Sequence, residues 1–532
     1  MKALRSFNTA GPCNPQEHYM IDPMRGLGKE ILTLIKEKSY FVIHAARQSG
    51  KTTLLRALAR HIRAEGDYYA LYCSLAGLDG VADSTFGISS VIATVKSALA
   101  DRAMPNAPSF ANGVDLSSPL TALQDALKDY CRSLGKPLVI LFDEADSLVG
   151  ATMIAFLQQI RNGYLERDEI PFVHSLALVG MRNIRDYKND YRDPSQTLGT
   201  ASPFNIASDS MTLKNFTKAE IAELYAQHTS DTGQLFLDDA VDFVWEQTQG
   251  QPWLVNAIAR VIVRQITASA PQAPVTVEMV SEAIQILIMR WDTHFDSLLA
   301  RLNEQRVRRA IEPIISGYGI VLSRNSSDYS YVRDMGLIRD DRGRVEPANP
   351  IYGDIIVRVL SRDTQEEIGL NGNSYPIPKY LKDGEIDIDT LLGDFQIFWR
   401  ENEAIWQKKY DYQEAAPQII VQAFLQRVVN GGGRITREMA AATGRIDLCV
   451  EYRGRRYPIE LKIRRGDDTY AEGLLQTAAY MDKLGIQKGW LVLFDQRKRL
   501  PWEDKLFVKK ELISSESGSG NEGGKTVTVY GC

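Results

Sequence analysis

The sequence is poor in cysteine and has no long hydrophobic run. Its five cysteines (Cys13, Cys73, Cys131, Cys449 and Cys532) are far apart, and no two form a CxxC pair. This pattern indicates neither a disulfide framework nor a structural zinc site. No apolar run approaches the roughly 18 residues of a transmembrane helix, and the N-terminus lacks the apolar stretch of a signal peptide. We therefore expect a cytoplasmic protein with no membrane partner.

Histidine and net charge are also low. All six histidines lie at or before His294, so histidine-based catalysis or metal binding is excluded from residues 295–532. The 62 Lys and Arg residues against 67 Asp and Glu give a net charge of −5. This balance argues against a uniformly basic coat for nucleic acid, although it leaves a local basic face open.

The first half of the chain alternates short apolar runs with helical patterns, which is typical of a parallel sheet covered by helices. The expected strands are 40–45, 68–74, 138–142 and 175–179. From about residue 210 the pattern changes to helices alone. One of these helices begins with a capping box, in which Thr217 and Glu220 bond each other's backbone amides.

The second half is less regular. Residues 286–362 have the order helix, short helix, hairpin and helix, which suits a small winged helix. Residues 363–412 contain prolines, acidic residues and an aromatic helix, and they fit a connector. Residues 413–532 have an α+β pattern that ends in a Gly/Ser loop and a final strand.

A phosphate-binding motif follows the first expected strand. A Walker A loop needs amides around the β-phosphate, a lysine for the terminal phosphates and a hydroxyl for Mg²⁺. Gly50, Lys51 and Thr52 have these types in this order, and Ala45 stands where the consensus has its first glycine. The residues expected to bind ATP here are Ala46, Arg47, Gln48, Ser49, Gly50, Lys51, Thr52 and Thr53.

A second motif completes this site. The apolar strand 138–142 ends in Asp143 and Glu144, as a Walker B segment should. We expect Asp143 to bind the nucleotide through Mg²⁺, with Thr52 as the other protein ligand. Glu144 would activate the attacking water, and Lys51 would stabilise the phosphates. A chance GKT in a loop is the alternative, but the second motif argues against it.

One strand lies between the two motifs and another follows the second. This order resembles the AAA+ and STAND ATPases. The resemblance implies a nucleotide sensor after the fourth strand, with Arg182 as the first candidate and Asn183 as the second; a surface role for Arg182 is equally open. It also implies a helical lid, and a site completed by an arginine of a neighbouring subunit. We therefore expect a homo-oligomer.

A third constellation lies near the C-terminus. Residues 444–463 are typical of a β-hairpin that turns near Gly454. Folding about Gly454 sets position 447 opposite 461, so Asp447 lies beside Glu460 and Lys462, which share one strand face. Two carboxylates bind Mg²⁺, and a lysine helps to activate water, as metal-assisted phosphodiester cleavage requires. A surface strand of ion pairs is the alternative.

The pattern Asp447…Glu460-Leu461-Lys462 resembles that of the PD-(D/E)XK nucleases. The resemblance implies a further Mg²⁺ ligand, Glu414, and a downstream polar residue, Gln476. Clustered arginines around this hairpin could bind phosphates; they are Arg453, Arg455, Arg456, Arg464 and Arg465.

Further segments resemble an AAA-like family of bacteria and archaea in which the ATPase is followed by a winged helix and a PD-(D/E)XK nuclease-like domain. They are FNTAGPCNPQEHYMI, SPFNI, GQPWLVNAIA, ANPIYGD and AFLQRVVNGGG. This resemblance implies that Gln251, Pro252 and Trp253 of the lid lie near the base or phosphates, whereas helix-cap and core roles are the default interpretation of Pro252 and Trp253. It also implies that residues 13–19 lie near the adenine.

The sequence thus predicts a multidomain α/β protein. Its parts are a parallel-sheet P-loop ATPase core of the additional-strand type (1–210), a helical lid (211–285), a winged helix (286–362), a connector (363–412) and an α+β restriction-endonuclease-like domain (413–532). We expect ATP hydrolysis to control a Mg²⁺-dependent nuclease with Asp447, Glu460 and Lys462 as catalytic residues. The expected substrate is DNA, in defence against foreign DNA or in mobile-element biology.

Two alternatives stay open. In one, the protein is an ATP-dependent switch whose nuclease-like domain is inactive and only binds DNA or a partner. In the other, it is an ATPase that acts on proteins and uses the C-terminal block as a scaffold.

Overall fold

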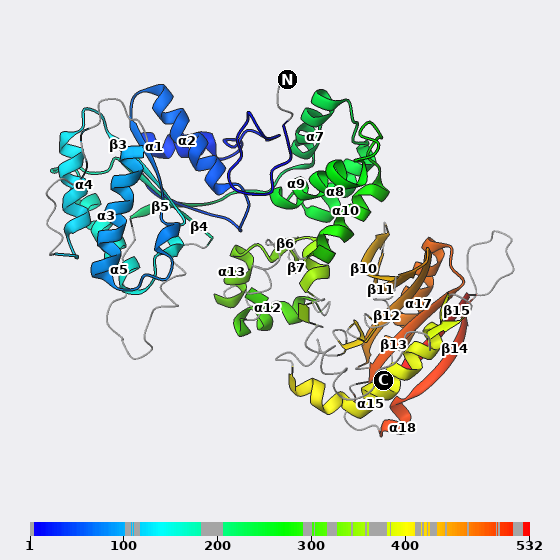
Figure 1. Cartoon of the computed structure of the whole chain (residues 1–532). Helices are drawn as coiled ribbons and strands as arrows, with labels where there is room; N and C mark the ends of the chain where they lie inside the picture. The colour runs from blue at the N-terminus through cyan, green and yellow to red at the C-terminus, as the bar shows by residue number, and fades with distance from the viewer. Residues whose placement is uncertain are drawn as a thin grey trace. The chain divides into compact units, whose positions relative to one another are not determined.

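The computed structural model describes residues 5–532 except for 102–107, 109, 111–117, 182–205, 291–300, 303, 316–326, 342–343, 357–358, 361–379, 383–384, 410–416, 418–419, 423, 426–432, 442–443, 465–467, 496, 498–500 and 514–524. The chain divides into two compact units, whose helices and strands are labelled in Figure 1. The first unit comprises Met1–Asp292 and Ser323–Arg339, and the second comprises Thr293–Leu322 and Asp340–Cys532.

A five-stranded parallel sheet forms the centre of the first unit, with the strand order β2-β3-β4-β1-β5. The strands are β1 (Tyr40–His44), β2 (Tyr69–Ser74), β3 (Leu138–Asp143), β4 (Ser175–Gly180) and β5 (Ala207–Thr212). The four strands expected from the sequence are confirmed to within a residue. The edge strand β5 is missing from the prediction, because its sequence ASDSMT lacks the apolar run of a buried strand.

Each face of this sheet has its own core, because successive residues of a strand point to opposite sides. Phe41, Leu141 and Val179 pack with the helices α1 (Gly28–Lys36) and α2 (Lys51–Glu65). Val42 and Phe142 pack on the other side. The helices there are α3 (Ser84–Asp101), α4 (Ala122–Ser133) and α5 (Gly150–Glu166). This arrangement places the start of α2 at the edge where the strands end.

A group of helices follows the sheet, as the sequence predicts. Its members are α7 (Lys218–Thr232), α8 (Asp238–Thr248), α9 (Pro252–Val261), the π-helical turn η3 (Ile262–Ile266) and α10 (Val277–Arg290). The expected capping box is present. The Thr217 hydroxyl accepts the amide of Glu220 at 3.3 Å, and the Glu220 carboxylate accepts the amide of Thr217 at 2.7 Å.

The helices and hairpin expected within 286–362 are also present. They are α12 (Gln305–Ile315), α13 (Ser327–Asp334), the hairpin of β6 (Ile338–Asp341) and β7 (Arg344–Pro347), and a final helical stretch at 350–356. Their assembly into a winged helix stays a prediction.

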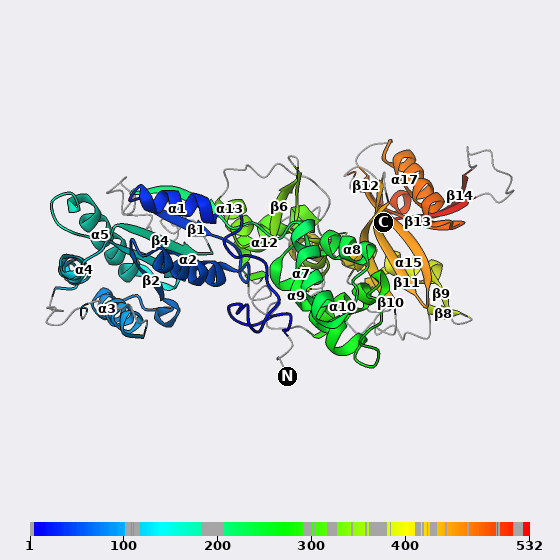
Figure 2. The same ribbon diagram turned by 90° about the horizontal axis from the view of Figure 1, so that it is seen from above.

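A six-stranded sheet of order β10-β11-β12-β13-β15-β14 forms the centre of the second unit. Its strands are β10 (Gly433–Ala441), β11 (Gly444–Tyr452), β12 (Arg455–Arg464), β13 (Lys488–Asp495), β14 (Phe507–Ile513) and β15 (Lys525–Gly531). The first three are antiparallel, whereas β12, β13 and β15 run parallel. The helix α17 (Asp468–Leu484) packs on β12 and β13 (Figure 2). Smaller elements are β8 (Leu381–Lys382), β9 (Glu385–Ile386) and α18 (Trp502–Lys505).

The long helix α15 (Ile388–Lys409) lies in the segment assigned to a connector, yet it belongs to the core of the second unit. Its rings of Phe395 and Trp399 lie 6.1 and 5.0 Å from the ring of Phe494 in β13. The indole of Trp490, also in β13, donates to the carboxylate of Asp389 at 2.9 Å. Of the helices that the structure describes, none is long and apolar enough to cross a membrane.

The capping box generates a stability prediction. Replacing Thr217 with alanine removes the acceptor for the Glu220 amide and should cost about 1 kcal/mol of local stability. Amides in the first turn of α7 should then exchange with deuterium about fivefold faster in native conditions. The control Thr217→Ser keeps the hydroxyl and should exchange like wild type. Equal exchange in all three proteins would contradict the role of this cap.

Candidate functional site

The loop between β1 and α2 has the geometry of a phosphate-binding loop. Its positive φ angles fall on Gln48 (56°) and Gly50 (96°), which turns the chain sharply before α2 begins at Lys51. Ala45 is buried and is not among the residues with positive φ, so alanine is tolerated where the consensus has glycine. The hydroxyl of Ser49 donates to the carbonyl of Ala46 at 2.8 Å. The positive end of the α2 dipole thus faces the loop.

The ammonium group of Lys51 is held by this loop. Its Nζ donates to the carbonyl oxygens of Ala45 and Ala46 at 2.7 and 2.8 Å. Burial lowers the pKa of Lys51 to about 8, although the carboxylates of Asp146, Asp143 and Glu144 act in the opposite direction. The lysine is therefore oriented by the loop and lies close to three acids.

The hydroxyl of Thr52 and the carboxylate of Asp143 lie together. Thr52 Oγ1 donates to Asp143 Oδ2 at 2.7 Å, and Asp143 is only 1% exposed. A carboxylate and a hydroxyl are hard oxygen donors of the kind that Mg²⁺ prefers. The pair predicted to hold Mg²⁺ fits that ion, and the structure brings it together at the end of β3.

A tyrosine that the sequence analysis missed joins this pair. Tyr72 of β2 donates its hydroxyl to Asp143 Oδ2 at 3.0 Å. Burial and the neighbouring Asp143 raise the pKa of Tyr72 to about 12, so it remains a donor. Its place at the end of β2, beside β3, was the only available signal in the sequence.

Glu144 follows Asp143 in a left-handed backbone conformation, with a φ of 54°. Glu144 is exposed to solvent, although neighbouring atoms partly bury its carboxyl group. Partial burial and the charges of Asp143 and Asp146 raise its pKa, which makes it a better proton acceptor than an ordinary glutamate. The predicted sensor residues, Arg182 and Asn183, lie outside the described residues.

The N-terminal segment is bonded to two helices of the first unit. The amide of Cys13 donates to Thr53 Oγ1 at 3.1 Å, and the indole of Trp253 donates to the carbonyl of Thr9 at 2.9 Å. Gln251 caps α9 by accepting the amide of Leu254 at 2.6 Å. Cys13, within the segment expected near the adenine, is thus bonded to α2, and Thr9, just before that segment, is bonded to α9.

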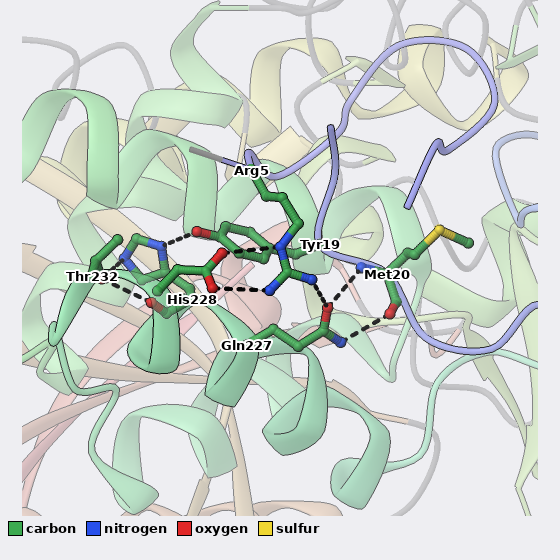
Figure 3. Close-up of polar contacts among 7 residues, drawn as sticks. Arg5, Tyr19, Met20, Gln227, His228 and Thr232 are labelled. Atoms are coloured by element: carbon green, nitrogen blue, oxygen red, sulfur yellow. Dashed lines mark hydrogen bonds and ion pairs between the residues drawn. The ribbon is translucent and has the colours of Figure 1, made fainter. Parts of the chain in front are cut away.

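The same segment is fastened to α7, as Figure 3 shows. Arg5 makes two bonds to the carboxylate of Asp231, at 3.0 and 3.1 Å, and a third to the Gln227 side chain at 3.2 Å. Gln227 also bonds the backbone of Met20, and Tyr19 Oη lies 3.3 Å from His228 Nδ1. No local sequence pattern predicts these contacts.

In the second unit, β11 and β12 form the expected hairpin. Leu448 pairs with Ile459, whereas the predicted register would place it opposite position 460. The pairing of the two strands is therefore shifted by one residue from the prediction. The turn residues are Arg453 and Gly454, with φ angles of 47° and 79°. Two successive positive φ angles are the requirement of a type I′ turn.

The three predicted nuclease residues lie together despite this shift. Lys462 Nζ contacts Glu460 Oε1 at 2.8 Å. Asp447 Oδ2 accepts the amide of Leu461 at 2.9 Å, and the amide of Asp447 donates to Glu460 Oε2 at 3.4 Å. The two acids and the lysine thus share one face of the sheet.

Burial beside Asp447 makes the charged form of Glu460 unfavourable. Glu460 is 2% exposed, and burial together with the charge of Asp447 raises its pKa to about 7. Burial also acts to lower the pKa of Lys462, but Glu460 and Asp447 raise it overall. A divalent cation would relieve the repulsion between the acids, so this pair fits one.

The other residues predicted for the nuclease site are Glu414, Gln476 and the clustered arginines. Glu414 and Arg465 lie outside the described residues. Among those described, no group of three or more His, Cys, Asp or Glu is arranged to hold a metal. Gln476 is exposed on α17. Three of the arginines expected to bind phosphates lie close to acids; the pairs are Arg455 with Glu385, Arg456 with Glu451 and Arg464 with Asp495.

Comparison with known proteins supports the assignment of the first unit. Residues 35–187 match the family model described as an AAA domain. No curated protein matches the chain. Together with the sheet order and the two motifs, the family match identifies an AAA-like P-loop ATPase domain.

Solved structures show likeness at low identity. The Walker-type ATPase PABY2304 of Pyrococcus abyssi is 13% identical, with a TM-score of 0.46, over 66% of this chain and 99% of that one. Cdc6p of Pyrobaculum aerophilum is 14% identical, with a TM-score of 0.36, over 65% and 96%. The RuvB Holliday junction branch migration motor of Thermotoga maritima is 13% identical, with a TM-score of 0.33, over 61% and 91%. Likeness at this level says nothing of substrate or partners.

The raised pKa of Glu460 predicts a pH effect on stability without divalent cations. Glu460 binds a proton more tightly in the folded state, so its contribution to stability is present below pH 4.5 and is lost as the pH rises towards 7. Asp447→Asn removes a charge that raises this pKa. The variant should therefore lose less stability than wild type between pH 5 and about 7.

Urea denaturation at several pH values, with EDTA present, measures this difference. Glu451→Gln is the matched control, because it removes an acid from the same strand four residues away; it should follow wild type. A pH dependence that is the same in wild type and Asp447→Asn would contradict the coupling of the two acids.

Proposed function

We propose that this protein binds and hydrolyses ATP in its first unit and that the nucleotide cycle controls a Mg²⁺-dependent nuclease in its second unit. The observation that supports the first part is the bond between Thr52 and Asp143 beside Lys51. The observation that supports the second is the cluster of Asp447, Glu460 and Lys462.

In the proposed ATPase reaction, Lys51 leaves the carbonyl oxygens of its own loop and contacts the terminal phosphates. Thr52 and Asp143 would hold Mg²⁺, which would screen the phosphate charge. Glu144 orients the attacking water and accepts its proton. Its raised pKa suits that task, because a base works best when its pKa lies closer to the working pH.

In the proposed nuclease reaction, Asp447 and Glu460 would hold Mg²⁺, which would polarise the scissile phosphate. Glu414 would be a further ligand. Lys462 is held by Glu460 and orients or helps to deprotonate the attacking water. DNA is the proposed substrate, a homo-oligomer the proposed assembly, and defence or mobile-element biology the proposed setting.

A specific observation favours a second candidate. Arginines near the hairpin are close to acids, and the described part of the chain contributes two acids to the cluster rather than three. The second candidate is therefore an ATP-dependent switch whose nuclease-like domain binds DNA or a partner without cleaving it.

ATP turnover by purified protein tests the first part. Glu144→Gln should still bind ATP but lower kcat by more than about 100-fold, because the variant lacks the base. Lys51→Ala should lose most ATP affinity. Glu169→Gln, an exposed acid of the same unit, is the control and should behave as wild type. Unchanged turnover in Glu144→Gln would contradict the assigned role of Glu144.

DNA cleavage tests the second part. Wild type with Mg²⁺ should cut DNA in an ATP-dependent manner, whereas Asp447→Ala should reduce cutting by more than about 100-fold. Glu503→Gln, an exposed acid of the same unit, is the control and should cut DNA as wild type does. If wild type and Asp447→Ala leave linear, circular and single-stranded DNA equally intact, the nuclease proposal must be abandoned in favour of the switch. ATP turnover that DNA stimulates would count against a protein-directed ATPase.

A further inference from the structure

The turn after β3 carries a third carboxylate to which neither Walker motif assigns a role. Asp146 lies in the short helical turn η2 (Ala145–Ser147), two residues beyond Glu144. Its Oδ2 accepts the backbone amide of Met181 at 3.0 Å. Met181 directly follows β4, which pairs with β3. This bond therefore ties the turn that carries Glu144 to the end of the neighbouring strand.

The end of β4 is shaped for this bond. Gly180 packs so closely on Asp146 that an added Cβ would lie 3.0 Å from the Asp146 carboxyl carbon. The carbonyl of Gly180 accepts the amide of Ala45 at 3.2 Å. The end of β4 is thus bonded through Gly180 to the start of the phosphate-binding loop, and through Met181 to Asp146 in the turn after β3.

Glu144 needs such support because of its backbone. A φ of 54° is unfavourable for a residue with a side chain, and it persists only where the surroundings impose it. Within the turn, the amide of Ser147 donates to the carbonyl of Glu144 at 3.0 Å. The bond from Asp146 to Met181 links this turn to the end of the neighbouring strand β4.

We infer that Asp146 is a positioning residue for ATP hydrolysis: by holding the amide of Met181, it fixes the turn so that the Glu144 carboxylate faces the site of the terminal phosphate. This inference rests on the proposed role of Glu144. Asp146 acts through Glu144 and contributes to turnover rather than to nucleotide affinity.

Two substitutions separate the hydrogen bond from the charge. Asp146→Asn keeps an oxygen that can accept the amide of Met181, whereas Asp146→Ala removes it. Asp146→Ala should lower kcat about tenfold with an ATP Kd within about twofold of wild type. Asp146→Asn should keep kcat within about threefold. Gly180→Ala, whose methyl group would push the Asp146 carboxylate by a few tenths of an ångström, should lower kcat in the same direction as Asp146→Ala but by less.

Several results would overturn the inference. They are an unchanged kcat in Asp146→Ala, an equal loss in Asp146→Asn and Asp146→Ala, and a loss of turnover explained by weaker ATP binding. If Asp146→Ala fails to fold, the comparison of Asp146→Asn with Gly180→Ala decides the question, since only the second should be impaired.

A second readout does not depend on turnover. In hydrogen–deuterium exchange, the segment 144–148 and the amide of Met181 should exchange faster in Asp146→Ala than in wild type, but not in Asp146→Asn. Unchanged exchange in Asp146→Ala would overturn the inference even if wild type hydrolyses ATP. Absence of turnover in wild type would instead count against the proposed function.

Discussion

The hydrogen bond from the Thr52 hydroxyl to the Asp143 carboxylate is the contact on which the ATPase site depends. Thr52 follows β1 and Asp143 ends β3, so the two residues are far apart in sequence. They meet because β1 and β3 both pair in parallel with β4, which brings their carboxyl ends to one edge of the sheet. The two buried faces of the sheet fix this order, and the site follows from it.

Both candidate sites use buried acids held beside a lysine. In the first unit the acids around Lys51 are bonded by Thr52, Tyr72 and the amide of Met181. In the second unit Glu460 is paired with Lys462 and carries a raised pKa because Asp447 is close. Each arrangement keeps acids in place at a cost that a bound cation would offset.

The sequence predicted what depends on local pattern. Apolar runs located β1 to β4, and the order Gly50-Lys51-Thr52 located the phosphate-binding loop, because strand burial and loop chemistry leave short-range signatures. The juxtaposition of Asp447 and Glu460 followed from a single hairpin. A shift of one register step did not separate them, since each acid also bonds through the backbone.

The contacts that the sequence did not predict join distant residues without a pattern. Arg5 and Asp231 are 226 positions apart, and either would pass as a surface residue. Asp146 and Met181 belong to different strand ends, and only the sheet order brings them together. The helix α15 was assigned to a connector, because its aromatic residues give no indication of the sheet on which they pack.

A structure of the protein with Mg²⁺ and a non-hydrolysable ATP analogue tests the central claim most directly, that one edge of the first sheet is an ATP site. The account predicts Mg²⁺ between Thr52 and Asp143, with Lys51 released from the carbonyls of Ala45 and Ala46 to contact the terminal phosphates. A nucleotide bound elsewhere, or Lys51 still on those carbonyls beside a bound nucleotide, would contradict it.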